Sequence, residues 1–146
     1  MLQYYYDLKE ANRFSELFGH TWIGMHPTGN QNSYIVLKFD FWVISVSEDI
    51  SRIEYNFNRY CNGLLSEISL SYPKLMEKAP DIHPDDDDAT NLVLWLGYMQ
   101  SSGAPPVYVI IDEYDNFVNQ LIIGYKDGLY RTITSKDSFL RVSLKS

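Results

Sequence analysis

The sequence of 146 residues has one cysteine, so the chain can form neither an internal disulfide framework nor a zinc site built from several cysteines. No apolar run approaches the roughly 18 residues of a membrane helix, so we expect no membrane partner. Basic residues are also few. The net charge of −7 argues against direct binding to nucleic acid or an anionic membrane surface. Met1–Asp7 lacks the basic region of a signal peptide, and a cytoplasmic, reducing location is therefore expected.

Hydrophobic residues are abundant, at 45% of the chain, and aromatic residues reach 15%. This composition excludes a disordered or low-complexity chain. A chain of this length can bury a core without cross-links, and residues 1–146 are expected to belong to one domain.

Two apolar runs predict strands, at Tyr34–Trp42 and Val107–Ile111. Both are rich in β-branched and aromatic residues, as is typical of strands in a parallel sheet that is covered on both faces. Between them, apolar residues at spacings of three and four predict a helix over Ile50–Ile68, with Ser45 and Glu48 as its capping box. The order strand, helix, helix, strand predicts an α/β fold with a mainly parallel sheet.

Several shorter predictions complete this outline. Cys61 lies on the apolar stripe of the long helix and is interpreted as a small buried hydrophobe. The run Asp85–Asp88 lacks the spacing and glycine of a calcium loop, so we interpret it as a solvated loop that leads into a helix. Helical spacing is expected in parts of Leu2–Phe18, a loop over Gly24–Ser33, and a short helix near Phe139.

The segment Val107–Glu113 has the form of a Walker B motif, in which an apolar strand is followed by two acidic residues. A parallel strand delivers its carboxyl end to the crevice where α/β sheets bind ligands. There Asp112 can hold Mg²⁺ and Glu113 can polarise a water molecule for attack on a phosphate. The alternative is an ordinary buried strand that ends in an acidic turn.

Asp40 stands in a similar position at the end of the first predicted strand. If the two strands are neighbours, its carboxylate lies on the same sheet edge as Asp112. Two interpretations stay open: an acid that lies near Mg²⁺ or the attacking water without binding the metal directly, or a residue that caps the turn.

The segment VYVIIDEYDNFVNQLI at Val107–Ile122 resembles the predicted AAA-ATPase-like family of Bacteroides-type bacteria, as do ELF at Glu16–Phe18 and YIVLKFDF at Tyr34–Phe41. The resemblance implies a P-loop NTPase-like three-layer sandwich. It also implies that the full-length protein binds and hydrolyses ATP with Mg²⁺. Within that family pattern, Asp112 is the implied metal ligand and Glu113 the implied catalytic residue.

The family pattern is incomplete here, because the chain contains no G-x-x-x-x-G-K-[ST] phosphate loop. Met1–Asp7 resembles the helix that follows this loop, and Asp137–Arg141 resembles the segment before the next core strand. We therefore expect residues 1–146 to be the central part of the domain, with the Walker A segment ahead of Met1. Trp42 also departs from the family, which tends to have a small residue there.

A chain without the phosphate loop is expected to lack ATPase activity on its own, with no certain cofactor. A parallel sheet that lacks a central strand exposes apolar surface, so we expect self-association. The alternative function is a nucleotide-free protein interaction module. A nuclease site is excluded for this chain, because no Glu has a Lys two residues later.

Overall fold

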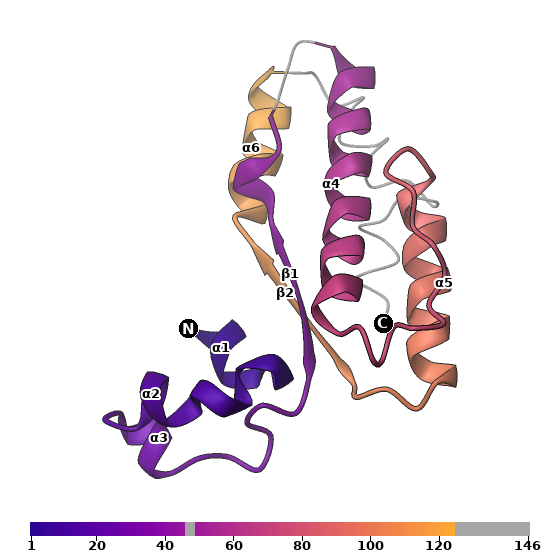
Figure 1. The fold of residues 1–146 in the computed structure, drawn as a ribbon. Coiled ribbons are helices and arrows are strands. Elements are labelled where there is room, and N and C mark those ends of the chain that lie inside the picture. The colour runs from indigo at the N-terminus through magenta and orange to yellow at the C-terminus, as the bar shows by residue number, and fades with distance from the viewer. Residues whose placement is uncertain (46–48, 125–146) are drawn as a thin grey trace.

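Two parallel strands form the centre of the structure. The computed structural model describes residues 1–45 and 49–124, in which β1 (Ile35–Asp40) pairs with β2 (Val107–Asp112). The register places Ile35 opposite Val107 and Asp40 opposite Asp112, and Figure 1 shows the two strands side by side. The predicted α/β class and the parallel direction of the two strands are confirmed.

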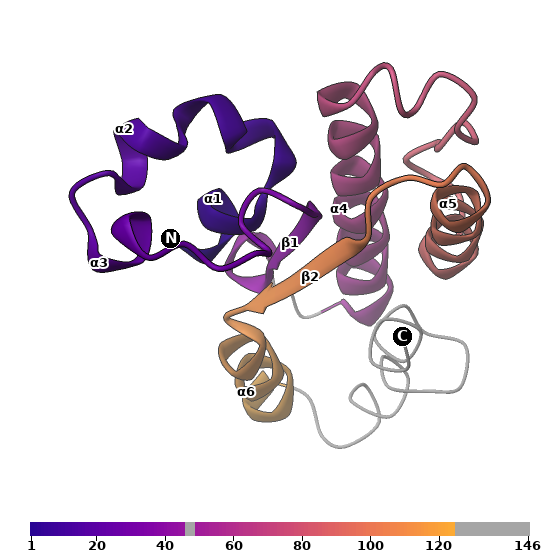
Figure 2. The ribbon, with the colours of Figure 1, turned by 90° about the horizontal axis from the view of Figure 1, so that it is seen from below.

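Helices lie on both sides of the strand pair (Figure 2). On one side are α4 (Ile50–Ser71) and α5 (Asp88–Ser101), which come between the two strands in the chain. On the other side is a group of short N-terminal helices. No helix within the described ranges is both long and apolar enough to cross a membrane. The remaining elements are α1 (Leu2–Tyr6), η1 (Leu8–Arg13), α2 (Phe14–Phe18), α3 (Trp22–Met25), η2 (Phe41–Val43) and α6 (Tyr114–Gly124).

The hydrophobic core lies between β1 and the apolar stripe of α4. Side chains alternate between the two faces of a strand, and Ile35, Leu37 and Phe39 are all buried in one cluster. The predicted stripe of α4 joins the same cluster, which confirms its interpretation as a core-facing surface. Its buried members are Ile53, Phe57, Cys61, Leu65 and Ile68, and Leu92, Trp95, Met99 and Phe117 complete the cluster.

The acidic run leads into a helix as predicted, with Asp87 as the N-cap of α5, but its last residue is buried and not solvated. Asp88 is only 9% exposed, while Asp85, Asp86 and Asp87 are exposed. Two contacts from α4 hold the segment inward: the Asn58 side-chain oxygen accepts a hydrogen bond from the Asp88 N–H at 2.8 Å, and Asn62 Nδ2 donates to the Asp86 carbonyl at 2.7 Å. The loop therefore turns its last carboxylate toward the core.

Cys61 is fully buried, as the sequence predicts. Burial raises the pKa of its thiol, with a smaller contribution from the nearby Asp88 carboxylate. A thiol held in the neutral form is a poor nucleophile, so Cys61 is a packing residue.

The start of α4 differs from the prediction. Asp49, and not Ser45, is the N-cap, because its side chain accepts a hydrogen bond from the Ser51 N–H at 3.0 Å. Glu48, the other half of the predicted capping box, lies outside the described residues.

The first strand and the loop before it are also shorter than predicted. The strand stops at Asp40, because the Asp40 carboxylate accepts from the Trp42 N–H at 3.2 Å and turns the chain into η2. The predicted loop at Gly24–Ser33 begins inside α3, which Thr21 caps through its contact with the Gly24 N–H. The predictions for Asp137–Arg141 and for a helix near Phe139 fall outside the described residues.

The second strand is half-buried, whereas the sequence predicts a strand covered on both faces. Val109 is 39% exposed, and no residue of β2 is fully buried. Within residues 1–45 and 49–124, β1 is the sole strand paired with β2. The second edge of β2 therefore receives no cover from a described strand.

The N-terminal helices are tied to the rest of the chain through Asp7. Its carboxylate is 1% exposed and accepts hydrogen bonds from the Tyr72 hydroxyl at the end of α4 and from the Lys9 N–H. Asp7 also forms a parallel bridge with Tyr34, just before β1. The ring of Tyr6 stacks on Tyr108 of β2, with centroids 4.8 Å apart. These contacts hold α1 against the face of the strands that lies opposite α4.

We expect the buried carboxyl group of Asp88 to make the chain less stable as the pH rises. Burial, reinforced by the charge of Asp87, raises the pKa of Asp88 from 3.8 to about 6. Between these pH values the folded chain binds more protons than the unfolded chain, so the free energy of unfolding falls, by roughly 1–3 kcal/mol once the group is ionised. Urea unfolding from pH 4 to pH 7 measures this change.

In that experiment Asp88→Asn should gain stability relative to the parent chain as the pH rises, because the amide cannot ionise. Asp86→Asn is the matched control, since Asp86 is exposed on the same loop. The same pH dependence for the parent and Asp88→Asn would contradict the assignment.

Candidate functional site

Two acidic side chains meet at the carboxyl end of the strand pair. Asp40 is the last residue of β1, Asp112 is the last residue of β2, and the register places them directly opposite each other. Alternation along β1 puts Asp40 on the face opposite the buried Leu37 and Phe39. The sequence-based expectation that both carboxylates lie on one edge of the sheet is confirmed.

Lys38 is a third charged residue at this edge, and the sequence reasoning missed it. Its ammonium lies 3.0 Å from Asp112 Oδ2 and 3.7 Å from Asp40 Oδ2. Its hydrogen bond with Asp112 is the main cause of a raised pKa, and the charges of both acids add to it. A sequence signal was present: Lys38 stands two residues before Asp40, so strand alternation places both on one face.

Asp40 also has a structural role at the end of β1. Its carboxylate caps η2 through the Trp42 N–H, and its own N–H donates to the Tyr60 hydroxyl oxygen at 2.7 Å. Tyr60 belongs to α4, and burial raises the pKa of its hydroxyl. The sequence left open whether Asp40 caps the turn or stands beside the metal ligand. The structure shows the cap and also places Asp40 beside Asp112.

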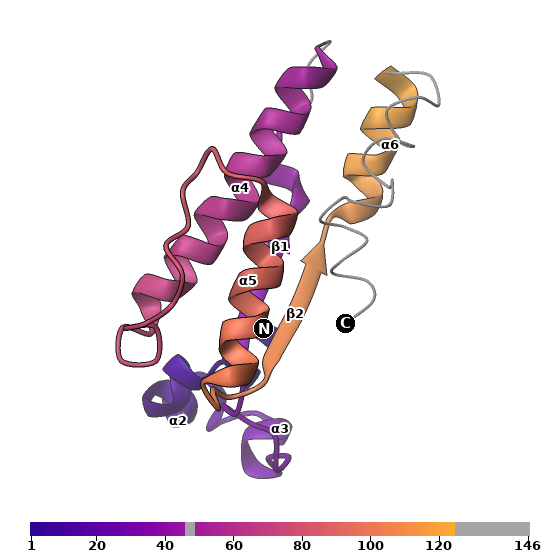
Figure 3. The ribbon, with the colours of Figure 1, turned by 90° about the vertical axis from the view of Figure 1, so that its right-hand side faces the viewer.

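Glu113 is the one residue between the end of β2 and the start of α6. Figure 3 shows the strand β2 leading directly into the helix α6. It is exposed, and its φ angle of 57° lies in the left-handed region that non-glycine residues rarely adopt. Its carbonyl accepts a hydrogen bond from the Phe117 N–H at 3.2 Å, which begins the α6 ladder. The strained turn brings Glu113 to the same end of the strand as Asp112, a setting in which backbone strain often accompanies function.

The donor set at this edge fits Mg²⁺ as a partial site. No group of three or more His, Cys, Asp or Glu side chains that could hold a metal ion occurs in residues 1–45 and 49–124. Mg²⁺ commonly uses one or two carboxylates and takes its other ligands from water and substrate phosphates. Asp112 is half-exposed, with 52% of its side-chain surface accessible, so it can supply one of those carboxylates. The remaining ligands would be water and phosphate oxygens.

Comparison with known proteins links the whole chain to one family. A family model described as "Predicted AAA-ATPase" matches residues 1–146. No curated protein and no solved structure matches the chain. The match includes both strands and the acidic residues that end them, so it covers every part of the candidate site.

We expect the backbone at Glu113 to carry strain that glycine relieves. A side chain in the left-handed region costs roughly 1–2 kcal/mol, and glycine adopts it freely. Glu113→Gly should therefore be more stable than Glu113→Ala by about 1 kcal/mol. The free energy of unfolding in urea measures the difference, and Glu113→Ala serves as the control because it removes the carboxylate but keeps Cβ. Equal stability of the two variants would show that the turn is unstrained.

Proposed function

The chain belongs to the predicted AAA-ATPase family, and from that premise we propose that it contributes the Walker B acids to a domain that binds and hydrolyses ATP with Mg²⁺. The observation that supports this proposal is the pair of acids at the end of β2. Asp112 ends a parallel strand, and Glu113 follows it in a strained turn. Parallel strands of α/β sheets present their carboxyl ends to the ligand crevice.

In this proposal, Asp112 would hold the cation directly or through a water molecule. The cation supplies charge neutralisation on the phosphate oxygens. Glu113 would accept a hydrogen bond from the attacking water and so orient that water. Its carboxylate is exposed, and the residue directly follows Asp112 in the chain. Asp40 lies opposite Asp112 and would add negative charge beside the cation without contacting the phosphates.

In this proposal the phosphates are bound by a G-x-x-x-x-G-K-[ST] loop outside residues 1–146, because the sequence contains no such loop. That loop supplies backbone N–H groups and a lysine that cradle the phosphates. Phosphoryl transfer depends mainly on such positioning and charge stabilisation. We therefore propose that ATP turnover belongs to a protein that carries both this chain and a phosphate loop, and that residues 1–146 alone have none.

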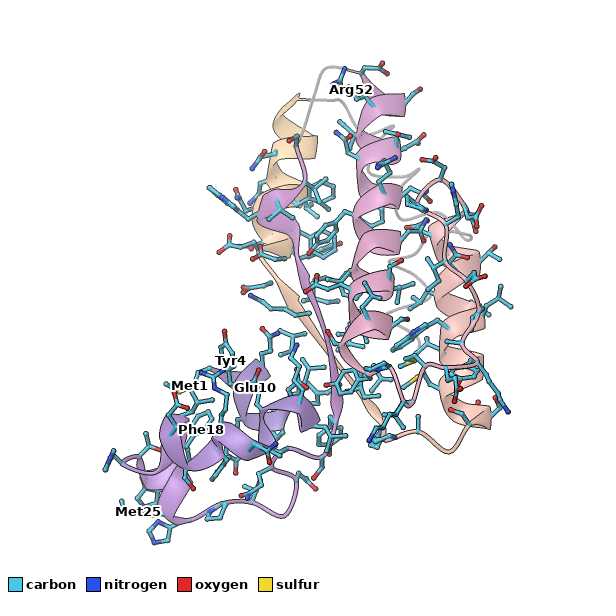
Figure 4. All side chains as sticks on the ribbon, viewed as in Figure 1. Met1, Tyr4, Glu10, Phe18, Met25 and Arg52 are labelled. Carbon is cyan, nitrogen blue, oxygen red and sulfur yellow. The ribbon has the colours of Figure 1, made fainter. Side chains whose placement is uncertain are left out.

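A second candidate function, a nucleotide-free interaction module, is supported by the exposed side chains of α3. Trp22 is 72% exposed, Met25 is 63% exposed, and the Trp22 ring stacks on the ring of His26. Figure 4 shows Met25 at the outer tip of the N-terminal helices, away from α4. Large apolar side chains gathered on one helix mark a contact surface, here proposed to bind a second copy of the chain.

The two acids should have separable effects on ATP turnover in a protein that joins this chain to a phosphate loop. Asp112→Asn should weaken binding of the Mg²⁺–ATP complex. Glu113→Gln should lower kcat by about a hundredfold or more and leave the Kd for ATP nearly unchanged, because a water-orienting base acts in the chemical step. Steady-state kinetics and equilibrium nucleotide binding measure the two effects. Magnesium-dependent hydrolysis by residues 1–146 alone, abolished by Glu113→Gln, would contradict the division of roles.

The interaction candidate predicts concentration-dependent self-association of residues 1–146. Replacing Trp22 and Met25 by Ser should shift the chain toward monomer, because both side chains would leave an apolar contact. Sedimentation velocity measures the change. Leu70→Ser is the control, since Leu70 is 82% exposed but lies on α4. A parent chain that stays monomeric at high concentration would exclude this candidate.

A further inference from the structure

The Lys38 ammonium lies beside the carboxylate oxygen of Asp112 that a bound cation would use. We propose that Lys38 is a positioning residue. Its ammonium pairs with Asp112 in the cation-free chain, and it moves to pair with Asp40 when a divalent cation binds Asp112. This inference rests on the proposed role of Asp112 as a cation ligand. In this inference Lys38 adjusts the cation affinity of Asp112, which the two acids alone cannot do.

The first argument is competition for one carboxylate oxygen. The Lys38 ammonium lies 3.0 Å from Asp112 Oδ2, which is hydrogen-bond distance. A cation ligated by the same oxygen must displace the ammonium, because two positive charges so close repel each other strongly. Among the described residues, Lys38 is the cationic side chain that pairs with Asp112. Breaking this ion pair is the electrostatic cost of binding a cation at Asp112.

The second argument is that Asp40 offers the displaced ammonium another partner. Asp40 Oδ2 already lies 3.7 Å from Lys38 Nζ, so a small movement of the flexible side chain suffices. Asp40 is held in place at the same time, since its other oxygen caps η2 and its N–H donates to Tyr60. The lysine therefore has a fixed second partner, while Asp112 remains half-exposed and open to a cation.

Charge arithmetic gives the direction of the effect. Asp40, Asp112 and Lys38 together carry one net negative charge, and removal of the ammonium leaves two. A divalent cation should bind the second arrangement more tightly. The groups are partly exposed, so solvent and salt moderate the gain. The lysine thus lowers the affinity of Asp112 for a free cation. A cation that also binds phosphate oxygens gains further ligands and can offset this loss.

The first test measures Mn²⁺ binding to residues 1–146 without nucleotide, from the loss of the electron paramagnetic resonance signal of free Mn²⁺. Lys38→Met should bind Mn²⁺ roughly three- to tenfold more tightly than the parent chain, because it removes one competing positive charge. Lys38→Gln should behave alike and guards against a folding defect in one variant. Arg59→Met is the matched control: it removes an exposed cation that pairs with Asp85 at 3.1 Å, far along the chain from both strands, and should leave the affinity unchanged.

A double-mutant cycle tests whether the Lys38 ammonium moves from Asp112 to Asp40. Asp40→Asn should weaken Mn²⁺ binding in the parent chain, because the displaced lysine loses its second partner. The same substitution should have a smaller effect in the Lys38→Met background, where only the direct attraction between the Asp40 charge and the cation is lost. An equal loss in both backgrounds would show that Asp40 acts on the cation through its own charge alone, and would overturn the proposed movement of Lys38 to Asp40.

Asp112→Asn separates this inference from the proposed function. Loss of Mn²⁺ binding in Asp112→Asn, and loss of paramagnetic broadening at the amides around Asp40 and Asp112, would support the cation role of Asp112. If that loss occurs but Lys38→Met binds no more tightly than the parent, the role of Lys38 is wrong and the proposed function stands. If Asp112→Asn binds Mn²⁺ as the parent does, the proposed cation role itself fails. Absence of binding by both the parent and Lys38→Met would overturn the inference, since removal of the lysine must raise affinity.

Discussion

The parallel register between β1 and β2 is the constraint on which the rest of the structure depends. It places Ile35, Leu37 and Phe39 against α4 and leaves Lys38 and Asp40 on the opposite face. A slip of β1 by one residue would exchange these two sets, burying two charges and exposing the centre of the core. The register that builds the core is therefore the same one that brings the acids together, and neither can change alone.

The sequence was sufficient for features that repeat along the chain. Continuous apolar runs identified both strands, and spacing of three and four residues identified α4 with its buried Cys61. Because parallel strands share one carboxyl edge, the meeting of Asp40 and Asp112 followed from the strand assignment. The ends of these elements were less accurate: Asp49 caps α4 in place of Ser45, and Asp40 stops β1 early, since a single side-chain hydrogen bond decides each boundary.

Other features depend on tertiary contacts that no local pattern records. Asp88 is buried because Asn58 and Asn62 of α4 bind the backbone of Asp88 and Asp86, and a run of four acids gives no sign of these contacts. Half-burial of β2 depends on its neighbours and not on its own apolar residues. At the candidate site, the sequence placed both acids but not the lysine between them, because Lys38 looked like an ordinary solvent-facing strand residue. The left-handed turn at Glu113 was equally hidden, since glutamate carries no preference for it.

The three tryptophans of the chain occupy three different surroundings. Trp95 is fully buried in the core, Trp22 lies exposed on the N-terminal helices, and Trp42 lies exposed two residues beyond Asp40. Indole fluorescence shifts to longer wavelength and becomes accessible to quenchers as the ring enters water. The intrinsic emission of this chain is consequently a sum of three separate signals, one from the interior, one from the edge that carries the acids and one from the N-terminal helices. Single replacements by phenylalanine would assign each component, giving a label-free optical reporter for each region of the fold.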